Sequence, residues 1–234
     1  MKVGLLSDVH ANKPALEAVL ADMPAVDACI HAGDVVGYGP YPSDVIGLFQ
    51  AHDIVSIQGN HDRGVLGEFT EDTHEIPRTA ARWTAERLDE SEMAYLETLP
   101  VERDLFEGAV HVAHGAPDAP DTYTYPEDFA PDLLSEESVL VLGHTHVQAK
   151  ATFDDGIVVN PGSVGLPRDG EWRAAYAVLD LDTASVELHR VEYPKEKAQT
   201  RITESDLPGQ LSEGLEHGEL VFGRAKRSED NAAE

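Results

Sequence analysis

Apolar and amphipathic segments alternate in the first part of the chain. Apolar, β-branched runs within 2–10, 27–34 and 54–62 are typical of strands. The segments between them, 13–23 and 41–52, have helical spacing. In the first of these the apolar positions share one face, at Leu16, Val19, Leu20 and Met23. Strand–helix alternation with buried strands predicts a βαβ layered fold.

The second half of the sequence has a different pattern, richer in strands. A long helical stretch comes first and is expected to split near Asp89, with Ser91 capping its second part. Strand-like runs and hairpin signals follow, with turns expected at Asp155-Gly156 and near Asp182-Thr183. The predicted segments are a helical stretch at 78–100, strands within 102–115 and 138–149, hairpins within 151–164 and 172–193, and a short helix within 207–218. Two packed sheets flanked by helices accommodate both halves.

Composition narrows the class of protein. With 41% hydrophobic residues the chain can bury a normal core, and we expect one domain at 1–218 followed by a disordered polar tail at 219–234. The charge is 17 basic against 44 acidic residues, a net −27. A surface this acidic repels nucleic-acid backbones and anionic membranes. It is compatible with attraction of metal ions, but its spread along the chain favours a salt-rich cytoplasm as the explanation.

Polar residues that can bind metals follow successive predicted strands. Ligands of α/β sheets bind where the carboxyl ends of strands open outward, so these residues are expected to meet. His144 and His146 are one residue apart, and in an extended backbone such residues point to the same side. The full set at the strand ends is Asp8, His10, Asp34, Asn60, His61, Asp62, His114, His144 and His146.

The order of these motifs, DxH, GD, GNHD, H and GHTH, resembles that of the calcineurin-like metallophosphoesterases. The wording "GDVVGYGPYP" is similar to the small prokaryotic, phosphodiesterase-type branch of that superfamily. The resemblance implies an α/β fold, a four-layer α/β/β/α sandwich of two mixed sheets flanked by helices. It also implies two divalent metal ions at one edge of the sandwich.

Residue roles carry over motif by motif. The resemblance implies that one ion is held by Asp8, His10 and His146, and the other by Asn60, His114 and His144. Asp34 would bridge the two, and His61 would be the catalytic histidine that assists the leaving group after a hydroxide shared by the ions attacks phosphorus. Asp62 is expected to orient its neighbours rather than bind metal. The donors are oxygen and imidazole, without thiolate, which suits Mn²⁺, Fe²⁺, Co²⁺, Ni²⁺ or Zn²⁺. Of these ions we expect Mn²⁺ first.

Two departures from the family pattern bear on the substrate. Where the Ser/Thr phosphatases have an Asp that pairs with the catalytic His and an Arg that clamps phosphate, this chain has Gly37 and Tyr38. Tyr38, Arg63 and Arg168 are therefore the candidate substrate-binding residues. Because fewer residues are then available to bind a dianionic phosphate, the sequence favours hydrolysis of phosphodiesters. A nucleotide or phosphomonoester phosphatase is the alternative, and a non-catalytic metal-binding scaffold is a third reading.

The expected partner is a small phosphate ester or nucleotide, with no membrane and no nucleic acid. The Pro-, Asp- and Tyr-rich segment at 115–131 is long for a plain connection, which favours a lid or binding loop. Its Tyr123 and Tyr125 are candidates for stacking on a base. The opening of the chain lacks a signal-type apolar segment, so a cytoplasmic location is expected. The oligomeric state stays open, a homo-oligomer included.

Overall fold

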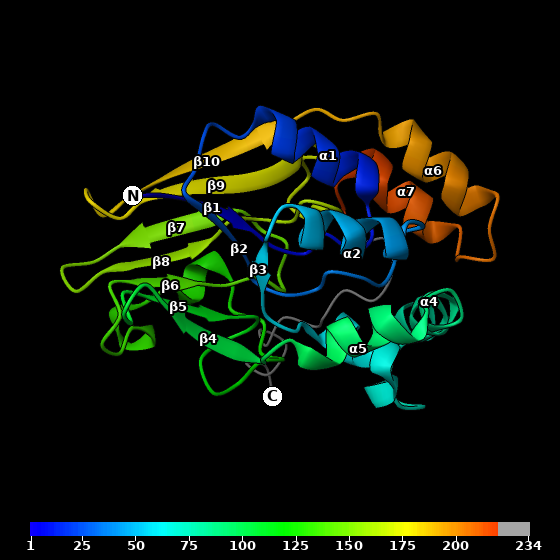
Figure 1. Ribbon diagram of the computed structural model, residues 1–234, viewed down its shortest axis with the longest axis horizontal. Helices are drawn as coiled ribbons and strands as arrows, with labels where there is room; N and C mark the ends of the chain where they lie inside the picture. Colours follow the sequence, from blue (N-terminus) through cyan, green and yellow to red (C-terminus); the bar gives the residue numbers. More distant parts are fainter. Residues whose placement is uncertain (220–234) are drawn as a thin grey trace, which may run out of the picture.

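A computed structural model describes residues 1–219 of the chain (Figure 1). It contains two five-stranded sheets, in the strand orders β10-β9-β1-β2-β3 and β4-β5-β6-β8-β7. The strands are β1 (Lys2–Leu6), β2 (Ala28–His31), β3 (Val55–Ser56), β4 (Glu102–Leu105), β5 (Val110–Ala113), β6 (Val139–Val141), β7 (Ala149–Thr152), β8 (Ile157–Asn160), β9 (Ala174–Asp180) and β10 (Ser185–Val191).

Both sheets are mixed. In the first sheet β1 pairs in parallel with β2 and antiparallel with β9, so that Leu5 lies between Ile30 and Ala177. In the second sheet β5, β6 and β8 run parallel, and β4 and β7 pair antiparallel at the edges. The hairpins β7–β8 and β9–β10 confirm both turns expected from the sequence. Parallel strands bring their carboxyl ends to one edge of each sheet, which is where the polar motifs follow them.

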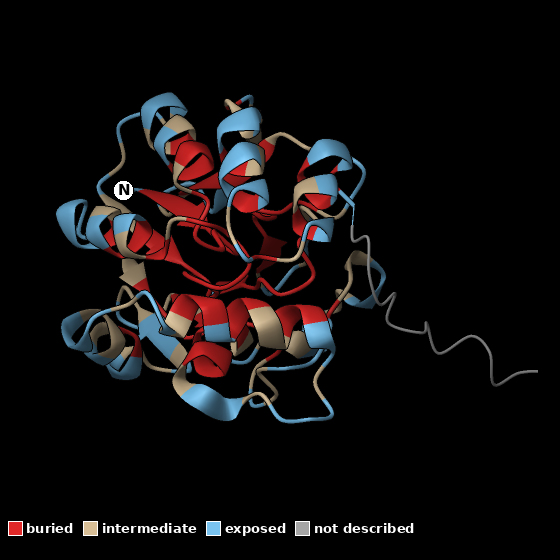
Figure 2. Ribbon diagram, turned by 90° about the vertical axis from the view of Figure 1, so that its right-hand side faces the viewer, coloured by how far each residue is buried: buried red, intermediate tan, exposed pale blue. Residues whose placement is uncertain are grey.

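One hydrophobic core lies between the two sheets, and another lies between the first sheet and the helices that cover it. Leu5 and Ile30 from the first sheet contact the cluster that includes Val112, Val141 and Val159 from the second. Figure 2 shows the central strands as buried, whereas the helices are exposed on their outer faces; the edge strands β4, β7 and β10 are largely intermediate or exposed. Each fully buried aliphatic side chain of this kind contributes about 1.5–3 kcal/mol relative to exposure. The chain thus has the two apposed apolar faces that the alternating strand pattern predicted.

Helices cover the outer faces and complete the four layers. In Figure 1, α1 and α2 lie over the first sheet, and α6 and α7 continue that layer. The outer face of the second sheet is covered by two short 3₁₀ helices, whose Phe129, Leu133 and Leu134 contact Leu140 and Val158. The helices are α1 (Lys13–Asp22), α2 (Pro42–Ala51), α3 (Asn60–Arg63), α4 (Glu75–Ala85), α5 (Glu90–Thr98), α6 (Lys195–Thr203) and α7 (Gln210–His217), with the π-helix η1 (Gly64–Glu68) and the 3₁₀ helices η2 (Pro126–Asp128) and η3 (Pro131–Leu133).

Three local expectations need comment. The long helical stretch does split, but Asp89 rather than Ser91 caps α5: its carboxylate accepts from the Ser91 and Glu92 backbone N–H groups at 2.8 and 2.9 Å. The strand expected to run through residue 62 ends at Ser56, and a helix begins at Asn60. The tail predicted from residue 219 lies, apart from that residue, outside the described part of the chain.

Within residues 1–219, no helix combines the length and the apolar composition needed to cross a membrane.

Candidate metal centre

The polar motifs meet on loops that follow the strands. Asp8 and His10 follow β1, Asp34 follows β2, and His144 and His146 follow β6. All five have left-handed backbone conformations, with φ between 47° and 65°. Non-glycine residues rarely adopt such angles, and they cluster where function requires it. The extended His144–His146 geometry expected from the sequence is therefore wrong: the loop is a tight turn, and Thr145 N–H donates to the Gly143 carbonyl at 2.7 Å.

Four buried side chains form the first part of the centre: Asp8, His10, Asp34 and His146. Their ligand atoms all lie within 4.8 Å of one another. The His146 Nε2 atom is 3.1 Å from Asp8 Oδ1 and 3.1 Å from His10 Nε2. The His10 Nε2 atom is 3.5 Å from Asp34 Oδ2. Two carboxylates and two imidazoles thus converge in a space closed to solvent.

The opposite nitrogens of the rings fix which atoms face this space. The Nδ1 atoms of His10, His114 and His146 lie 3.3, 2.7 and 2.5 Å from the carbonyl oxygens of Val36, Ala32 and Leu166. A carbonyl only accepts, so each Nδ1 carries a proton, and in the neutral form of each ring Nε2 presents a lone pair to the centre. The facing Nε2 lone pairs of His10 and His146 repel unless a cation lies between them. This tautomer pattern is that of metal-binding histidines.

A second group of donors lies on the other side of Asp34. The His114 Nε2 atom is 3.3 Å from Asp34 Oδ2 and 3.1 Å from Asn60 Oδ1. The His144 ring lies 4.9 Å from the His114 ring, centroid to centroid, and its buried Nε2 has no hydrogen-bond partner among the described residues. Asp34 Oδ2 therefore lies within 3.5 Å of an imidazole from each group. It is the atom through which two cations can share one carboxylate.

The electrostatics of the centre favour positive charge. Burial alone disfavours a charged His114, but the Asp34 and Asp8 carboxylates outweigh it and raise its pKa to about 9. Asp8 Oδ1 and Asp34 Oδ2 are buried and accept no hydrogen bond within the described chain. Buried anionic oxygens left in this state are costly unless a cation compensates them. The donors fit divalent ions of the borderline to hard kind, which oxygen and imidazole ligands suit.

Asp62 holds the two loops that carry Asp34 and Asn60. It is fully buried, and its carboxylate accepts four backbone N–H groups, from Asp34, Val35 and Gly59 at Oδ2 and from Val36 at Oδ1, at 3.0–3.2 Å. This agrees with the orienting role expected from the sequence.

A second support comes from the segment "NPGSVG" at 160–165, which belongs to the family resemblance but was given no role from the sequence. The Asn160 amide donates to the Gly143 carbonyl at 2.6 Å and to Thr145 Oγ1 at 3.0 Å. The Ser163 hydroxyl donates to the Asp8 carbonyl at 2.7 Å. These bonds explain how the loops after β1 and β6 keep strained backbones. The clustered Asn, Pro, Gly and Ser were the available signal.

His61 lies beside the first group. Its ring centroid is 4.9 Å from that of His10 and 4.1 Å from that of Tyr38, and its backbone N–H donates to Asp34 Oδ1 at 2.8 Å. No carboxylate takes the place of the missing family partner: Nδ1 is buried and unpaired among the described residues. A Cβ atom at Gly37, where φ is +87°, would lie 3.0 Å from the His61 Cβ and 3.1 Å from its Nδ1. Burial lowers the pKa of His61 to about 4.

The two candidate arginines differ in how they are used. The Arg63 guanidinium pairs with Asp121 and lies 3.3 Å from Glu68 Oε2. Arg168 has a buried Nε without a hydrogen-bond partner among the described residues, and its Cζ lies 6.0 Å from the Tyr38 ring centroid. Burial raises the pKa of Tyr38, and the Arg168 charge opposes that rise, as it does for Tyr123. Arg168 is thus a cation beside the centre that interacts with two tyrosines and has no carboxylate partner among the described residues.

A buried set of carboxylates and imidazoles at the strand ends of an α/β sandwich defines a metal-dependent hydrolase of phosphate esters. The model of the calcineurin-like phosphoesterase superfamily domain matches residues 1–184, and the chain belongs to this family. The family and the fold inferred from the motif order are both confirmed.

Relatives extend over most of the chain. It is 31% identical, over 91% of its length and 96% of the other's, to the uncharacterized protein MJ0912 of Methanocaldococcus jannaschii. It is 27% identical to phosphodiesterase YfcE of Escherichia coli, over 80% of its own length and 91% of the relative's. The crystal structure of a metallophosphoesterase from Sphaerobacter thermophilus superposes with a TM-score of 0.80 at 33% identity, covering 93% of this chain and 99% of that one. These similarities support the small prokaryotic branch.

Proposed function

We propose that this protein is a dinuclear metal-dependent phosphodiesterase. The observation that carries the proposal is the position of Asp34 Oδ2, within 3.5 Å of an imidazole from each of two buried donor groups. A single ion would leave one of these groups uncompensated. The similarity to a protein named as a phosphodiesterase supports the choice of ester class.

The residues divide as follows. Asp8, His10 and His146 would hold one ion, Asn60, His114 and His144 the other, and Asp34 both. When bound, such a pair of ions lowers the pKa of a shared water and offsets charge on the phosphoryl oxygens. Mn²⁺ is the ion we propose first, because imidazole and carboxylate donors suit it. Asp62 and Asn160 would keep the ligand loops in place through their backbone hydrogen bonds.

His61 would assist departure of the leaving group as a neutral hydrogen-bond donor. With a pKa lowered to about 4 by burial, the ring is uncharged near pH 7 and still has one N–H to donate. The ring keeps this proton, and the proton that the leaving oxygen accepts comes from water. This is a more specific role than the general acid expected from the family pattern.

Arg168 supports the proposed preference for diesters. A phosphomonoester dianion calls for more positive charge than a diester monoanion, and among the described residues Arg168 is the candidate cation beside the centre without a carboxylate partner. Arg63, the other candidate, is already paired with two carboxylates. Tyr38, which packs on His61, completes the group. We also infer a cytoplasmic location in a salt-rich cell, which the net charge of −27 supports.

The phosphodiesterase, the phosphatase and the non-catalytic scaffold predict different rates of ester hydrolysis. Bis(4-nitrophenyl) phosphate and 4-nitrophenyl phosphate release the same product, so the ratio of their kcat/KM values compares diester with monoester directly. We expect metal-stripped protein to be inactive in high salt, Mn²⁺ to restore turnover, and the ratio to exceed one. A ratio below one would favour the phosphatase reading. Bound metal without turnover of either ester would favour the scaffold.

Substitutions at the site, compared with the same substitutions at exposed positions, distinguish an effect on catalysis from an effect on folding. Asp34→Asn and His61→Ala should each lower kcat by about 10²-fold or more, the scale of a lost catalytic group. The same chemical changes at exposed positions, Asp206→Asn and His52→Ala, serve as controls. Full activity in Asp34→Asn would contradict the shared-carboxylate arrangement.

A further inference from the structure

A pocket of about 350 Å³ opens beside the second donor group. His61 is not part of its wall, so it lies away from the side assigned to the leaving group. Its volume is at the lower end of the range for small-molecule sites, enough for one planar group rather than a long chain. The residues that line it are Asn60, Arg63, Glu68, Phe69, Thr73, Asp121, Tyr123 and His144.

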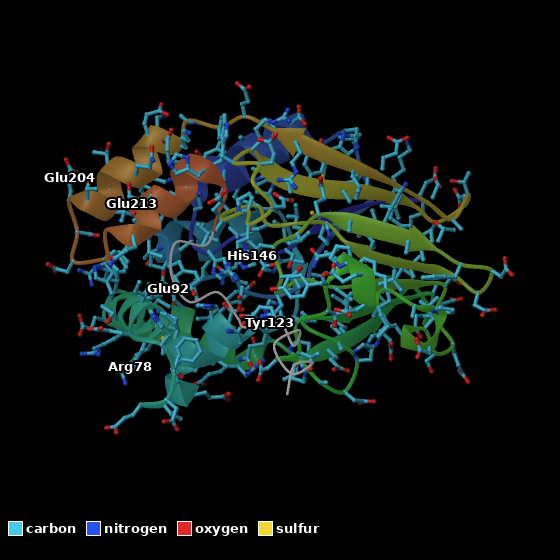
Figure 3. All side chains as sticks on the ribbon, turned by 180° about the vertical axis from the view of Figure 1, so that it is seen from behind. Arg78, Glu92, Tyr123, His146, Glu204 and Glu213 are labelled. Atoms are coloured by element: carbon cyan, nitrogen blue, oxygen red, sulfur yellow. The ribbon has the colours of Figure 1, made fainter. Side chains whose placement is uncertain are left out.

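Tyr123 forms an aromatic wall of this pocket. Its ring lies 4.0 Å from the His144 ring at an interplanar angle of 27°, and the Tyr125 ring is nearly parallel to it, at a centroid distance of 6.1 Å and an angle of 14°. Tyr123 is nevertheless 42% exposed, among the most exposed large hydrophobic side chains of the described chain. It is labelled in Figure 3, as is His146 of the metal centre. An exposed ring fixed beside a hydrolytic centre offers a stacking surface to whatever enters.

The charges of the pocket exclude a second phosphate. Arg63 is neutralised by Asp121 and Glu68, so the three charged residues together carry a net −1. Arg168, the other cation near the centre, acts on Tyr38 and Tyr123 and is not among the residues that line the pocket. An anionic group in the pocket would face two carboxylates with their only cation already paired. A flat, uncharged group suits the lining far better.

The position of Tyr123 depends on the same ion pair. Arg63 is buried at the end of α3, and through Asp121 it ties down the loop that presents Tyr123 two residues later. Arg63 is in this account a positioning residue for the loop rather than a phosphate ligand.

We propose that this pocket binds the organic group that stays on phosphorus, a nucleoside or an aryl group, stacked against Tyr123. The inference rests on the proposed phosphodiesterase function and names its substrate class: diesters with one planar, uncharged substituent. Base–aromatic stacking of this kind typically changes binding at least about fivefold.

The test uses two diesters that release the same product from metal-loaded protein. Thymidine 5′-(4-nitrophenyl phosphate) carries a nucleoside as the retained group, and methyl 4-nitrophenyl phosphate carries a methyl group. We expect wild type to prefer the first in kcat/KM, and Tyr123→Ala and Tyr123→Leu to reduce that preference at least about fivefold, mainly through KM. Tyr123→Phe, which keeps the ring, should retain it. Using the ratio cancels differences in the amount of folded, metal-loaded enzyme.

An unchanged ratio in Tyr123→Ala would overturn the pocket assignment while leaving the phosphodiesterase in place. Faster turnover of diadenosine tetraphosphate than of the thymidine diester would also overturn it, because that substrate places charged phosphates where the pocket is acidic. Absence of turnover of both diesters by metal-loaded wild type is a different result: it would remove the proposed function and the pocket assignment with it.

Discussion

Replacing Asp62 by Asn is the substitution whose consequences the structure defines best. The side chain keeps its size and loses its charge. If the amide oxygen takes the Oδ2 position, it still accepts from Asp34, Val35 and Gly59. The amide NH₂ then faces the Val36 N–H, which is 3.0 Å from Oδ1 in the native protein, and two donors oppose each other. In the other amide orientation, the NH₂ group would face the backbone N–H groups of Asp34, Val35 and Gly59, so three donors would lack an acceptor.

The magnitude follows from these four bonds. Hydrogen bonds to a charged acceptor contribute roughly 1.5–3 kcal/mol and neutral ones roughly 0.5–1.5, while a buried unsatisfied donor costs about 1–3 kcal/mol. Removing a buried charge next to Asp34 offsets part of the loss. We therefore expect Asp62→Asn to lower the free energy of unfolding by about 2–4 kcal/mol. Because Asp62 fixes the loops of Asp34 and Asn60, metal affinity should fall about 10–100-fold.

Urea unfolding of the metal-free protein measures the first effect, and competition with a chelating dye measures the second. Asp44→Asn is the matched control, because Asp44 is an exposed carboxylate paired with Lys13 and such pairs contribute about 0–1 kcal/mol. If Asp62→Asn matched Asp44→Asn in both unfolding free energy and metal affinity, the structural role assigned to Asp62 would be refuted.

Three further predictions address catalysis, core and surface. Burial keeps His61 uncharged, with a pKa of about 4, so kcat of the wild type should not decline as the pH rises from 6 to 8. A decline in the pH–rate profile with an apparent pKa of 6–7, about that of a free imidazole, would contradict the neutral-donor role. Leu5→Ala empties a fully buried position between the sheets and should cost about 2–5 kcal/mol in urea unfolding, against less than about 0.5 kcal/mol for Leu188→Ala, which is 36% exposed. Because a net charge of −27 is poorly screened in dilute buffer, Tm should fall as salt is lowered from about 1 M to about 0.01 M, and a constant Tm by circular dichroism would remove the salt-adaptation hypothesis.

Sequence reasoning located the site because each motif directly follows an apolar strand, and parallel strands end at a common edge. Asp8, Asp34, His114 and His146 were found in this way and lie together in the fold. The periodicity of apolar residues does not predict the backbone dihedral angles of single residues. The choice of Asp89 over Ser91 as a helix cap depends on one residue's φ and ψ, and both are good capping residues.

Other features depend on contacts between segments far apart in sequence. From the sequence, Arg63 and Arg168 were equivalent candidates. In the structure Arg63 pairs with Asp121, whereas Arg168 has no carboxylate partner among the described residues. The left-handed turns at His144 and His146 are held by Asn160, from another strand. Such strain is visible only once the supporting hydrogen bonds are known. The pocket under Tyr123 likewise joins α3, η1 and a distant loop.

The central claim is that two ions share Asp34 and that both are needed for hydrolysis. Its most direct test is a Mn²⁺ titration of metal-stripped protein in high salt, with bound metal and turnover of bis(4-nitrophenyl) phosphate measured in the same samples. The account predicts saturation at two ions per chain, with most of the activity arriving with the second ion, and weaker binding with little activity in Asp34→Asn. Full activity at one ion per chain, or binding of two ions unaffected by Asp34→Asn, would contradict it.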